Sequence, residues 1–439
     1  MRKSLALVFA LLFCVSAPAL AQKKPAKPVD KGFVWDNRPT FVFGKDIHVD
    51  IRGKLQLDWR HIDPPQKNES IFDFHSARIG LKGEVTKNFE FEAERVIACA
   101  AQSDPEAFSP CQDFEIGQWK DVYLIWKHYN KFELEGGRFK MPFGMETITG
   151  STDLDFAYRA LASSTIGPSR DTGGMVSGRF YGRDITYQAG FFHHDGDHGE
   201  LKTPQFTEDG SPAPEPGPSF AVRVTGTPLR KLGVPRRLKS LRMGTAYTNA
   251  FLPEGLNSTK GKSVLDGKTF FQPVYVKGRR QRYSAELEWT PKQFGLKAEW
   301  MQSREDRHEQ SNRNEDLSDF LATGWYVTAT WTITGENAGD NPKKPLFKGG
   351  FGSVEVAGRY EELGFTSAEH VGKAFTNPRA DNLVPNADRV WTGGVNWKLN
   401  RWVQLVGNAI HENFLDPTRT ISSGLNSFWT GLFRTQVTF

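Results

Sequence analysis

Hydrophobic and polar residues alternate along most of the chain, beginning with the stretch IHVDIRGKLQLDWR at Ile47–Arg60. Apolar residues occupy every second position of this stretch except Gly53, and all the positions between them are polar or charged. Side chains of consecutive residues in a β-strand point to opposite faces of the sheet. The pattern therefore predicts strands with one apolar face and one polar face.

The same alternation recurs up to the last segment, FWTGLFRTQVTF, and about sixteen such strands can be counted. Most are close to the roughly 9–11 residues that a tilted strand needs to cross a bilayer. The connections alternate between short turns, such as TKN at Thr86, and long loops, such as 99–120 and 141–172. Outer-membrane barrels have short periplasmic turns and long extracellular loops. We therefore predict an all-β fold, a transmembrane antiparallel β-barrel of about 16 strands at residues 47–439.

The charges on the polar row indicate which face of the barrel wall meets lipid. Placing Arg52 and Lys54 against hydrocarbon would cost about 2–4 kcal/mol each. The apolar row is therefore expected to face lipid, and the polar row a water-filled lumen. A soluble β-sandwich also alternates, but its strands are short and close on one compact core. Sixteen long strands favour the barrel.

The N-terminal segment predicts export. Arg2 and Lys3 precede a short apolar run, and Ala19-Leu20-Ala21 forms a small-x-small cleavage site. This arrangement is typical of a secretory signal peptide at residues 1–21. Residues 22–46 would then form a periplasmic N-terminal segment, and the expected location is the bacterial outer membrane.

Composition is consistent with a polar lumen and gives no sign of nucleic-acid binding. Removal of Arg2 and Lys3 with the signal peptide lowers the net charge from +5 to +3, which is nearly balanced. The mean hydropathy of −0.51 looks soluble, yet 13% of residues are aromatic and most lie in the alternating segments. A barrel can combine these features because its lumen and loops are wet.

Two cysteines, Cys99 and Cys111, remain after the signal peptide is removed. In an exported chain they are expected to form one disulfide within a long loop, and two free thiols are the alternative.

Several segments resemble the family of outer-membrane porins that includes the phosphate-selective porins O and P. They include RGKLQLDWR, ARIGLKGEVTKNFEFEAE, GRFKMPFGMETITG, STIGPSRDTGGMVSG and GWYVTATWTITGE, in family order. The resemblance implies a sixteen-stranded barrel, usually a trimer, whose third external loop, about 141–172, folds inward as a constriction. It also implies that lumenal arginines and lysines guide anions such as phosphate.

Parity along the strands selects the candidate anion-guiding residues. On the polar row lie Arg52, Lys54, Arg60, Arg78, Lys82, Arg223, Arg280, Arg282, Arg359 and Lys398, and the resemblance adds Arg159 and Arg170 in the third loop. Each could instead be an ordinary solvated side chain paired with a nearby acid. Acidic residues also face inward, and Glu84, Glu90, Glu286, Glu288 and Glu355 are expected near the periplasmic end. We therefore hypothesise a lumen that is basic in its outer and middle parts and acidic at its exit.

Passive diffusion of small hydrophilic solutes, with a preference for anions, is the predicted function. A non-selective general porin and a plugged barrel with a binding or structural role are the alternatives. The sequence shows no convincing nucleophile with a base near it, so an enzyme is not predicted. No cofactor is expected. FHHDGDHGE at Phe192–Glu200 offers ligands for zinc or calcium, but a solvated loop is favoured and no metal site is predicted. The expected partners are small anions or polar solutes, outer-membrane lipid and two further copies of the chain.

Overall fold

The computed structural model describes residues 31–35, 38–63, 70–98, 118–129, 131–182, 184–196, 217–264, 269–416 and 426–439. Strands dominate these residues, with only short helical turns between them. In this described part of the chain, no helix combines the length and the apolar character needed to cross a membrane.

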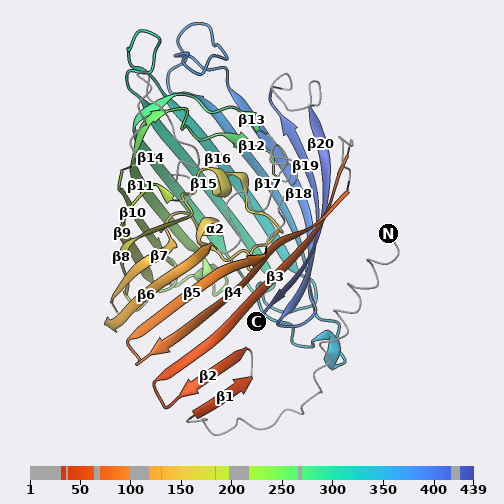
Figure 1. Cartoon of the computed structure of the whole chain (residues 1–439). Coiled ribbons are helices and arrows are strands. Elements are labelled where there is room, and N and C mark those ends of the chain that lie inside the picture. Colours follow the sequence, from red (N-terminus) through yellow and green to blue (C-terminus); the bar gives the residue numbers. More distant parts are fainter. Residues whose placement is uncertain are drawn as a thin grey trace.

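Sixteen antiparallel strands form a closed barrel, as predicted (Figure 1). In chain order the first eight are β3 (Ile47–Asp63), β4 (Ser70–Val85), β5 (Phe89–Ala98), β6 (Trp119–Tyr129), β7 (Phe132–Lys140), β8 (Arg170–Phe180), β9 (Ile185–Phe192) and β10 (Ser219–Gly226). The other eight are β11 (Arg242–Gly255), β14 (Val276–Trp289), β15 (Phe294–Arg307), β16 (Leu317–Thr332), β17 (Ser353–Ser367), β18 (Asn386–Lys398), β19 (Val403–Phe414) and β20 (Ser427–Thr438). Each pairs with its neighbours in the chain, and β20 pairs with β3 to close the cylinder.

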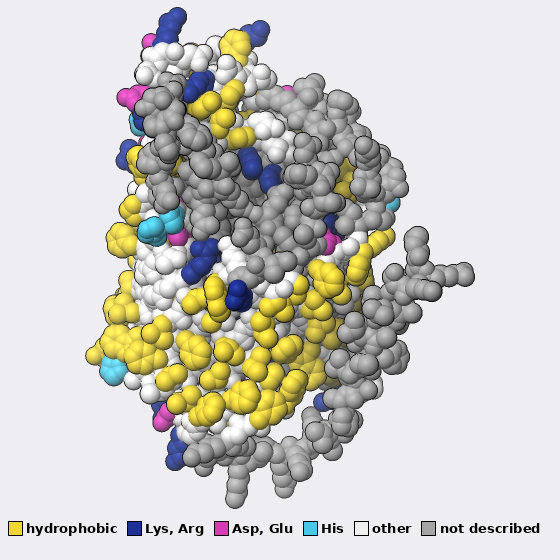
Figure 2. Space-filling view, viewed as in Figure 1, with side chains coloured by type: hydrophobic (Ala, Val, Ile, Leu, Met, Phe, Trp, Pro, Cys, Tyr) yellow, Lys and Arg dark blue, Asp and Glu magenta, His cyan; other side chains and the backbone are white. Residues whose placement is uncertain are grey.

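The two rows of the alternating pattern face opposite sides of the wall, as the sequence predicts. On β3, Trp59 is 46% exposed, whereas its neighbours Asp58 and Arg60 are each only 4% exposed. Exposed apolar side chains recur around the wall and form a broad band on the face seen in Figure 2. The outer surface of the barrel is therefore apolar over the span that meets lipid.

Gly53, the one interruption of the apolar row on β3, marks the point where the barrel closes. The backbone of Gly53 exchanges two hydrogen bonds of 3.0 Å with the C-terminal residue, Phe439. The Phe439 ring lies over Gly53, and a Cβ atom there would overlap the ring. Glycine at this position therefore leaves room for the last aromatic side chain of the chain.

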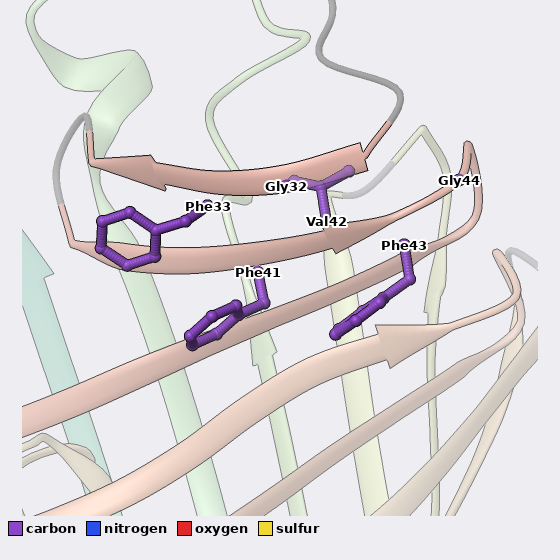
Figure 3. Close-up of a pocket in the computed structure, with 6 residues that line it drawn as sticks. All are labelled: Gly32, Phe33, Phe41, Val42, Phe43 and Gly44. Atoms are coloured by element: carbon purple, nitrogen blue, oxygen red, sulfur yellow. The ribbon is translucent and has the colours of Figure 1, made fainter.

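A hairpin of β1 (Lys31–Trp35) and β2 (Pro39–Phe43) precedes the barrel and pairs with the start of β3. These two strands were not predicted from the sequence. The hairpin carries a pocket lined by Gly32, Phe33, Phe41, Val42, Phe43 and Gly44 (Figure 3). Phe41 and Phe43 pair in register with Val49 and Ile47, so these aromatic side chains extend the apolar row of β3.

Part of the lumen is filled by apolar side chains, which the sequence analysis did not predict. The inner row of β16 and β17 includes Phe320, Ala322, Leu363 and Phe365, all at most 1% exposed. A small hairpin of β12 (Gly261–Lys262) and β13 (Thr269–Phe271) lies between β11 and β14 in the chain. Its Phe270 and Phe271 rings pack on Phe365 with centroids 5.7 and 4.8 Å away. One side of the barrel interior is therefore a packed core.

Candidate functional site

The third long connection, residues 141–169, folds into the barrel as the sequence analysis expected, and we call it the inward loop. It contains two short helices, α2 (Met145–Ile148) and α3 (Leu161–Thr165). Both lie inside the barrel (Figure 1), and the side chains of Phe143, Phe156 and Ile166 join the buried apolar core. The inward loop therefore divides the lumen.

Carboxylates on the barrel wall hold the two helices. Glu299 of β15 accepts hydrogen bonds from the backbone N–H groups of Met145 and Glu146, the second at 3.0 Å. Glu361 of β17 accepts one from Leu161 N–H at 2.6 Å. The first N–H groups of a helix lack partners within the helix, and negative charge is favourable there. The wall carboxylates thus fasten the inward loop to the β15–β17 side.

Arg359 of β17 clamps the inward loop from the same side. Its Nη2 donates to Glu146 Oε1 at 2.7 Å, and its Nε donates to Thr328 Oγ1 at 3.0 Å. The guanidinium also lies 4.6 Å from the Phe156 ring centre and 4.9 Å from that of Tyr326, within cation–π range. Arg359 is only 3% exposed, and the Glu146 carboxylate of the inward loop compensates its charge.

Three other predicted arginines are also buried in ion pairs. Arg280 and Arg282 of β14 both bind Asp195, which follows β9, with Nη1–Oδ2 and Nη2–Oδ2 distances of 2.7 and 2.8 Å respectively. Arg280 Nε also donates to Glu305 at 2.9 Å. Arg223 of β10 forms a two-pronged ion pair with Glu286. The role of Asp195 was missed by the sequence analysis, which considered it as a metal ligand.

Cations and acids also pair at the two ends of the β3–β5 wall. Arg60 lies 3.9 Å from Asp73, toward the long-loop end. At the short-turn end, Arg52 Nη1 lies 2.8 Å from Glu92. Lys82 Nζ lies 2.8 Å from Glu90 and 3.1 Å from Glu92. Acids expected to make the exit negative are therefore balanced in part by neighbouring cations.

Five basic side chains gather on the opposite side of the inward loop from Arg359. This basic cluster consists of Lys54 on β3, Arg78 on β4, Lys140 on β7, Arg159 in the inward loop and Arg170 on β8. The charges of Arg78, Arg159 and Arg170 all act on Lys54, and those of Arg159 and Arg170 act on Lys140. Four of the five residues were among the predicted candidates.

Lys140 is the member that the sequence analysis missed. Alternation along β7 would place it on the lipid-facing row with Leu134, which is 43% exposed. The chain turns inward directly after Lys140, at Met141-Pro142, and carries the side chain with it. The usable signal was the proline, because proline cannot donate to the ladder and marks the end of a strand.

Neutral oxygen atoms hold three members of the basic cluster. Lys54 Nζ donates to Ser151 Oγ at 2.7 Å, and Lys140 Nζ donates to the Thr149 carbonyl at 2.6 Å. Arg159 donates to the carbonyls of Thr149 and Glu146, the first at 2.6 Å. Within the described residues, no carboxylate lies at salt-bridge distance from these three cations. Burial and the nearby Arg170 and Arg78 lower the pKa of Arg159 to about 10, so it stays charged at neutral pH.

The other two members of the cluster have carboxylate partners. Arg78 Nη1 donates to Glu94 at 2.9 Å. Arg170 forms a two-pronged pair with Asp121 at 2.9 and 2.7 Å. These two side chains are 10% and 11% exposed, whereas the side chains of Arg282 and Arg359, taken without their backbone atoms, are each 1% exposed. Arg78 and Arg170 are therefore better solvated than Arg282 and Arg359.

The remaining candidate chemistry is limited. His193 and His194 are in ring contact, and Asp195 is engaged by Arg280 and Arg282. In the part of the chain that the structure describes, no three histidine, cysteine or acidic side chains are placed to hold a metal ion. Residues 197–200 of the segment Phe192–Glu200, and both Cys99 and Cys111, lie outside the described residues.

A closed sixteen-stranded barrel with an apolar exterior, a charged lumen and an inward loop defines an outer-membrane channel. The family model for phosphate-selective porin O and P matches residues 49–422, and the chain belongs to this family. It is thus a porin of the bacterial outer membrane, and family and fold support a channel rather than an enzyme.

Solved porin structures share the fold at low sequence identity. The outer membrane channel DcaP of Acinetobacter baumannii is 9% identical, with a TM-score of 0.55 over 90% of this chain and 98% of that one. OmpF of Salmonella typhi in complex with daunomycin is 12% identical, with a TM-score of 0.54 over 93% and 100%. OmpT of Vibrio cholerae in its trimer form is 10% identical, with a TM-score of 0.51 over 90% and 100%. No curated protein sequence matches the chain.

Proposed function

We propose that this porin is a passive channel that prefers anions, and that the basic cluster is its anion-attracting element. The observation that carries the proposal is the way Lys54, Lys140 and Arg159 are held. Hydroxyl and carbonyl oxygens fix these basic side chains in place, and among the described residues no carboxylate lies at salt-bridge distance from them. Fixed positive charge in a narrow, low-dielectric passage raises the local concentration of anions and lowers their barrier to entry.

Four of the arginines that were predicted to guide anions have a different role in this proposal. Arg223, Arg280, Arg282 and Arg359 are at most 4% exposed and are paired with carboxylates. A buried charge that is fully paired is expected to maintain structure, because separating it would leave its partner uncompensated. The proposal therefore assigns anion contact to the basic cluster, loop anchoring to Arg280, Arg282 and Arg359, and the joining of wall strands to Arg223. Arg52 and Arg60 also lie near acids and contribute less to the net field.

Planar bilayers containing the purified porin test the preference. In a KCl gradient, the reversal potential should have the sign of chloride selectivity, and the double variant Lys54→Gln with Arg159→Gln should move it toward zero. Arg313→Gln is the matched control, because Arg313 is an exposed cation in the connection between β15 and β16. A reversal potential near zero in the unmodified porin would favour the non-selective alternative, and the absence of ohmic steps would favour a plugged barrel.

Phosphate is the anion that the family description suggests. The planar forks of Arg78, Arg159 and Arg170 suit paired, charge-assisted hydrogen bonds to its oxygen atoms. If phosphate binds in the basic cluster, submillimolar phosphate should reduce the chloride conductance, whereas sulfate should do so less. Equal effects of the two anions would reduce the proposal to general anion preference.

We further infer export and assembly. The segment 1–21 is proposed to be removed as a signal peptide, leaving 22–46 in the periplasm and the barrel in lipid, and an intact mass starting at Gln22 would test this. Cys99 and Cys111 are proposed to be disulfide-bonded, which alkylation before and after reduction would test.

A homotrimer is proposed because the OmpT structure is described as a trimer form. Light scattering in detergent would measure the number of copies.

A further inference from the structure

One short-side connection, the turn at residues 227–241 between β10 and β11, is strongly basic. From position 230 to 242 the chain contains no acidic residue and carries six cations: Arg230, Lys231, Arg236, Arg237, Lys239 and Arg242. Leucine and valine residues alternate with these cations, as in LRKLGVPRRLKSL. The segment therefore combines basic and apolar character at one end of the barrel.

Contacts at two points fix the turn to the barrel. Lys231 Nζ lies 3.0 Å from Asp184 and donates to the Tyr181 carbonyl at 2.7 Å, both in the neighbouring turn between β8 and β9. Trp289 at the end of β14 donates its Nε1–H to the Arg237 carbonyl at 2.8 Å. A short helical turn, η2 (Leu238–Ser240), follows. These contacts hold the turn in one position against its neighbours.

The middle of the turn presents charges and apolar side chains to the outside. Arg236 and Arg237 are exposed, and Lys239 is half-buried. Across the described residues, none of these three cations forms an ion pair. Leu232 and Leu238 beside them are 53% and 38% exposed. Three uncompensated cations and two exposed leucines make a surface that no described residue of the barrel covers.

The lipid-facing surface of the barrel continues into this turn. Val224, just before the turn on β10, is 41% exposed, and Met243, just after the turn on β11, is 47% exposed. The turn thus lies where the apolar outer surface ends on the short-turn, periplasmic side. A basic segment with exposed leucines at a membrane interface is attracted both by anionic headgroups and by the acyl boundary.

We propose that the turn at 227–241 binds anionic phospholipid of the periplasmic leaflet. Arg236, Arg237 and Lys239 would contact phosphate groups, and Leu232 and Leu238 would enter the acyl boundary. Phospholipid is favoured over a soluble acidic protein or the cell wall because the leucines adjoin the lipid-facing rows, where an aqueous partner could not cover them. The proposal is independent of ion selectivity in the lumen.

The test compares lipid preference in reconstituted porin. Bilayers of phosphatidylcholine would carry spin-labelled phosphatidylglycerol or spin-labelled phosphatidylcholine, and the immobilised fraction of each probe would be measured. The variant Arg236→Gln, Arg237→Gln, Lys239→Gln should reduce the preference for phosphatidylglycerol by at least about fivefold. The matched control, Lys260→Gln, Arg313→Gln, Lys373→Gln, removes three exposed cations at the long-loop end and should leave the preference unchanged.

Two outcomes would overturn the proposal. The first is an equal preference for phosphatidylglycerol in the unmodified porin and the triple variant, with conductance showing that both are folded. The second is binding of the unmodified porin to isolated cell walls that is lost in the triple variant, without any lipid preference. In that case the basic turn would contact the wall polymer instead.

Discussion

Lys54 of β3 and Arg78 of β4 are direct register partners, so two positive side chains face each other across neighbouring strands inside the barrel. Lys140 and Arg170 repeat this relationship at the ends of β7 and β8. Like charges at directly opposite positions destabilise a sheet. The register thus brings basic side chains together in the lumen at a cost in stability, as is common at functional sites.

Removing one of the opposed charges should therefore stabilise the barrel. We predict that Lys54→Gln raises the free energy of unfolding in detergent by about 0.2–1 kcal/mol, while the chloride preference falls. Glutamine can still donate to Ser151, so the hydrogen bond need not be lost. Urea unfolding and the reversal potential, measured on the same preparation, check the two effects. A variant that loses stability would show that Lys54 mainly anchors the inward loop.

Loss of the Arg359 clamp should loosen the inward loop. Arg359→Leu would leave the Glu146 carboxylate buried without its cation, which costs about 3–5 kcal/mol. We expect larger single-channel conductance with more current noise, together with faster proteolysis within 141–169. The control is Arg389→Leu, whose ion pair with Glu362 has side chains 46% and 30% exposed and should contribute at most about 1 kcal/mol. Unchanged conductance in Arg359→Leu would contradict the assigned role.

Alternation along the chain predicted the barrel and the facing of most side chains, because parity depends only on neighbouring positions. It placed Lys54 and Arg78 correctly, but it could not reveal that Glu146 and Asp195 approach Arg359 and Arg282. Those partners lie in connections whose paths are set by packing inside the lumen. Lys140 was missed for a related reason, since strand parity fails where the chain leaves the strand.

Asp195 forms ion pairs with Arg280 and Arg282. These ion pairs should make the free energy of unfolding depend on pH only in acid. Burial raises the pKa of Asp195, but the two guanidinium groups outweigh it and hold the pKa below its ordinary value. A lowered pKa contributes stability that is fully present above about pH 4, the unfolded value. This contribution is lost as the pH falls further, through the folded value.

Unfolding of the porin and of Asp195→Asn, measured between pH 2.5 and 7, tests this dependence. The stability difference between them should be constant above about pH 5 and should shrink below about pH 4. The matched control is Asp46→Asn, because Asp46 is exposed in the turn between β2 and β3. A difference that already disappears near pH 6 would mean that Asp195 is not held by the two arginines.

Closure of the barrel should depend on the absence of a side chain at Gly53. Gly53→Val would displace the Phe439 ring from its place over β3, and overpacking of this kind typically costs about 1–3 kcal/mol. The backbone hydrogen bonds between the two residues would weaken at the seam between β3 and β20. Slower folding into detergent and a lower midpoint of thermal unfolding are the expected results. Gly358→Val on β17 is the matched control, because a Cβ atom at Gly358 meets nothing within 4 Å. If both variants lose stability equally, the seam makes no special demand for glycine.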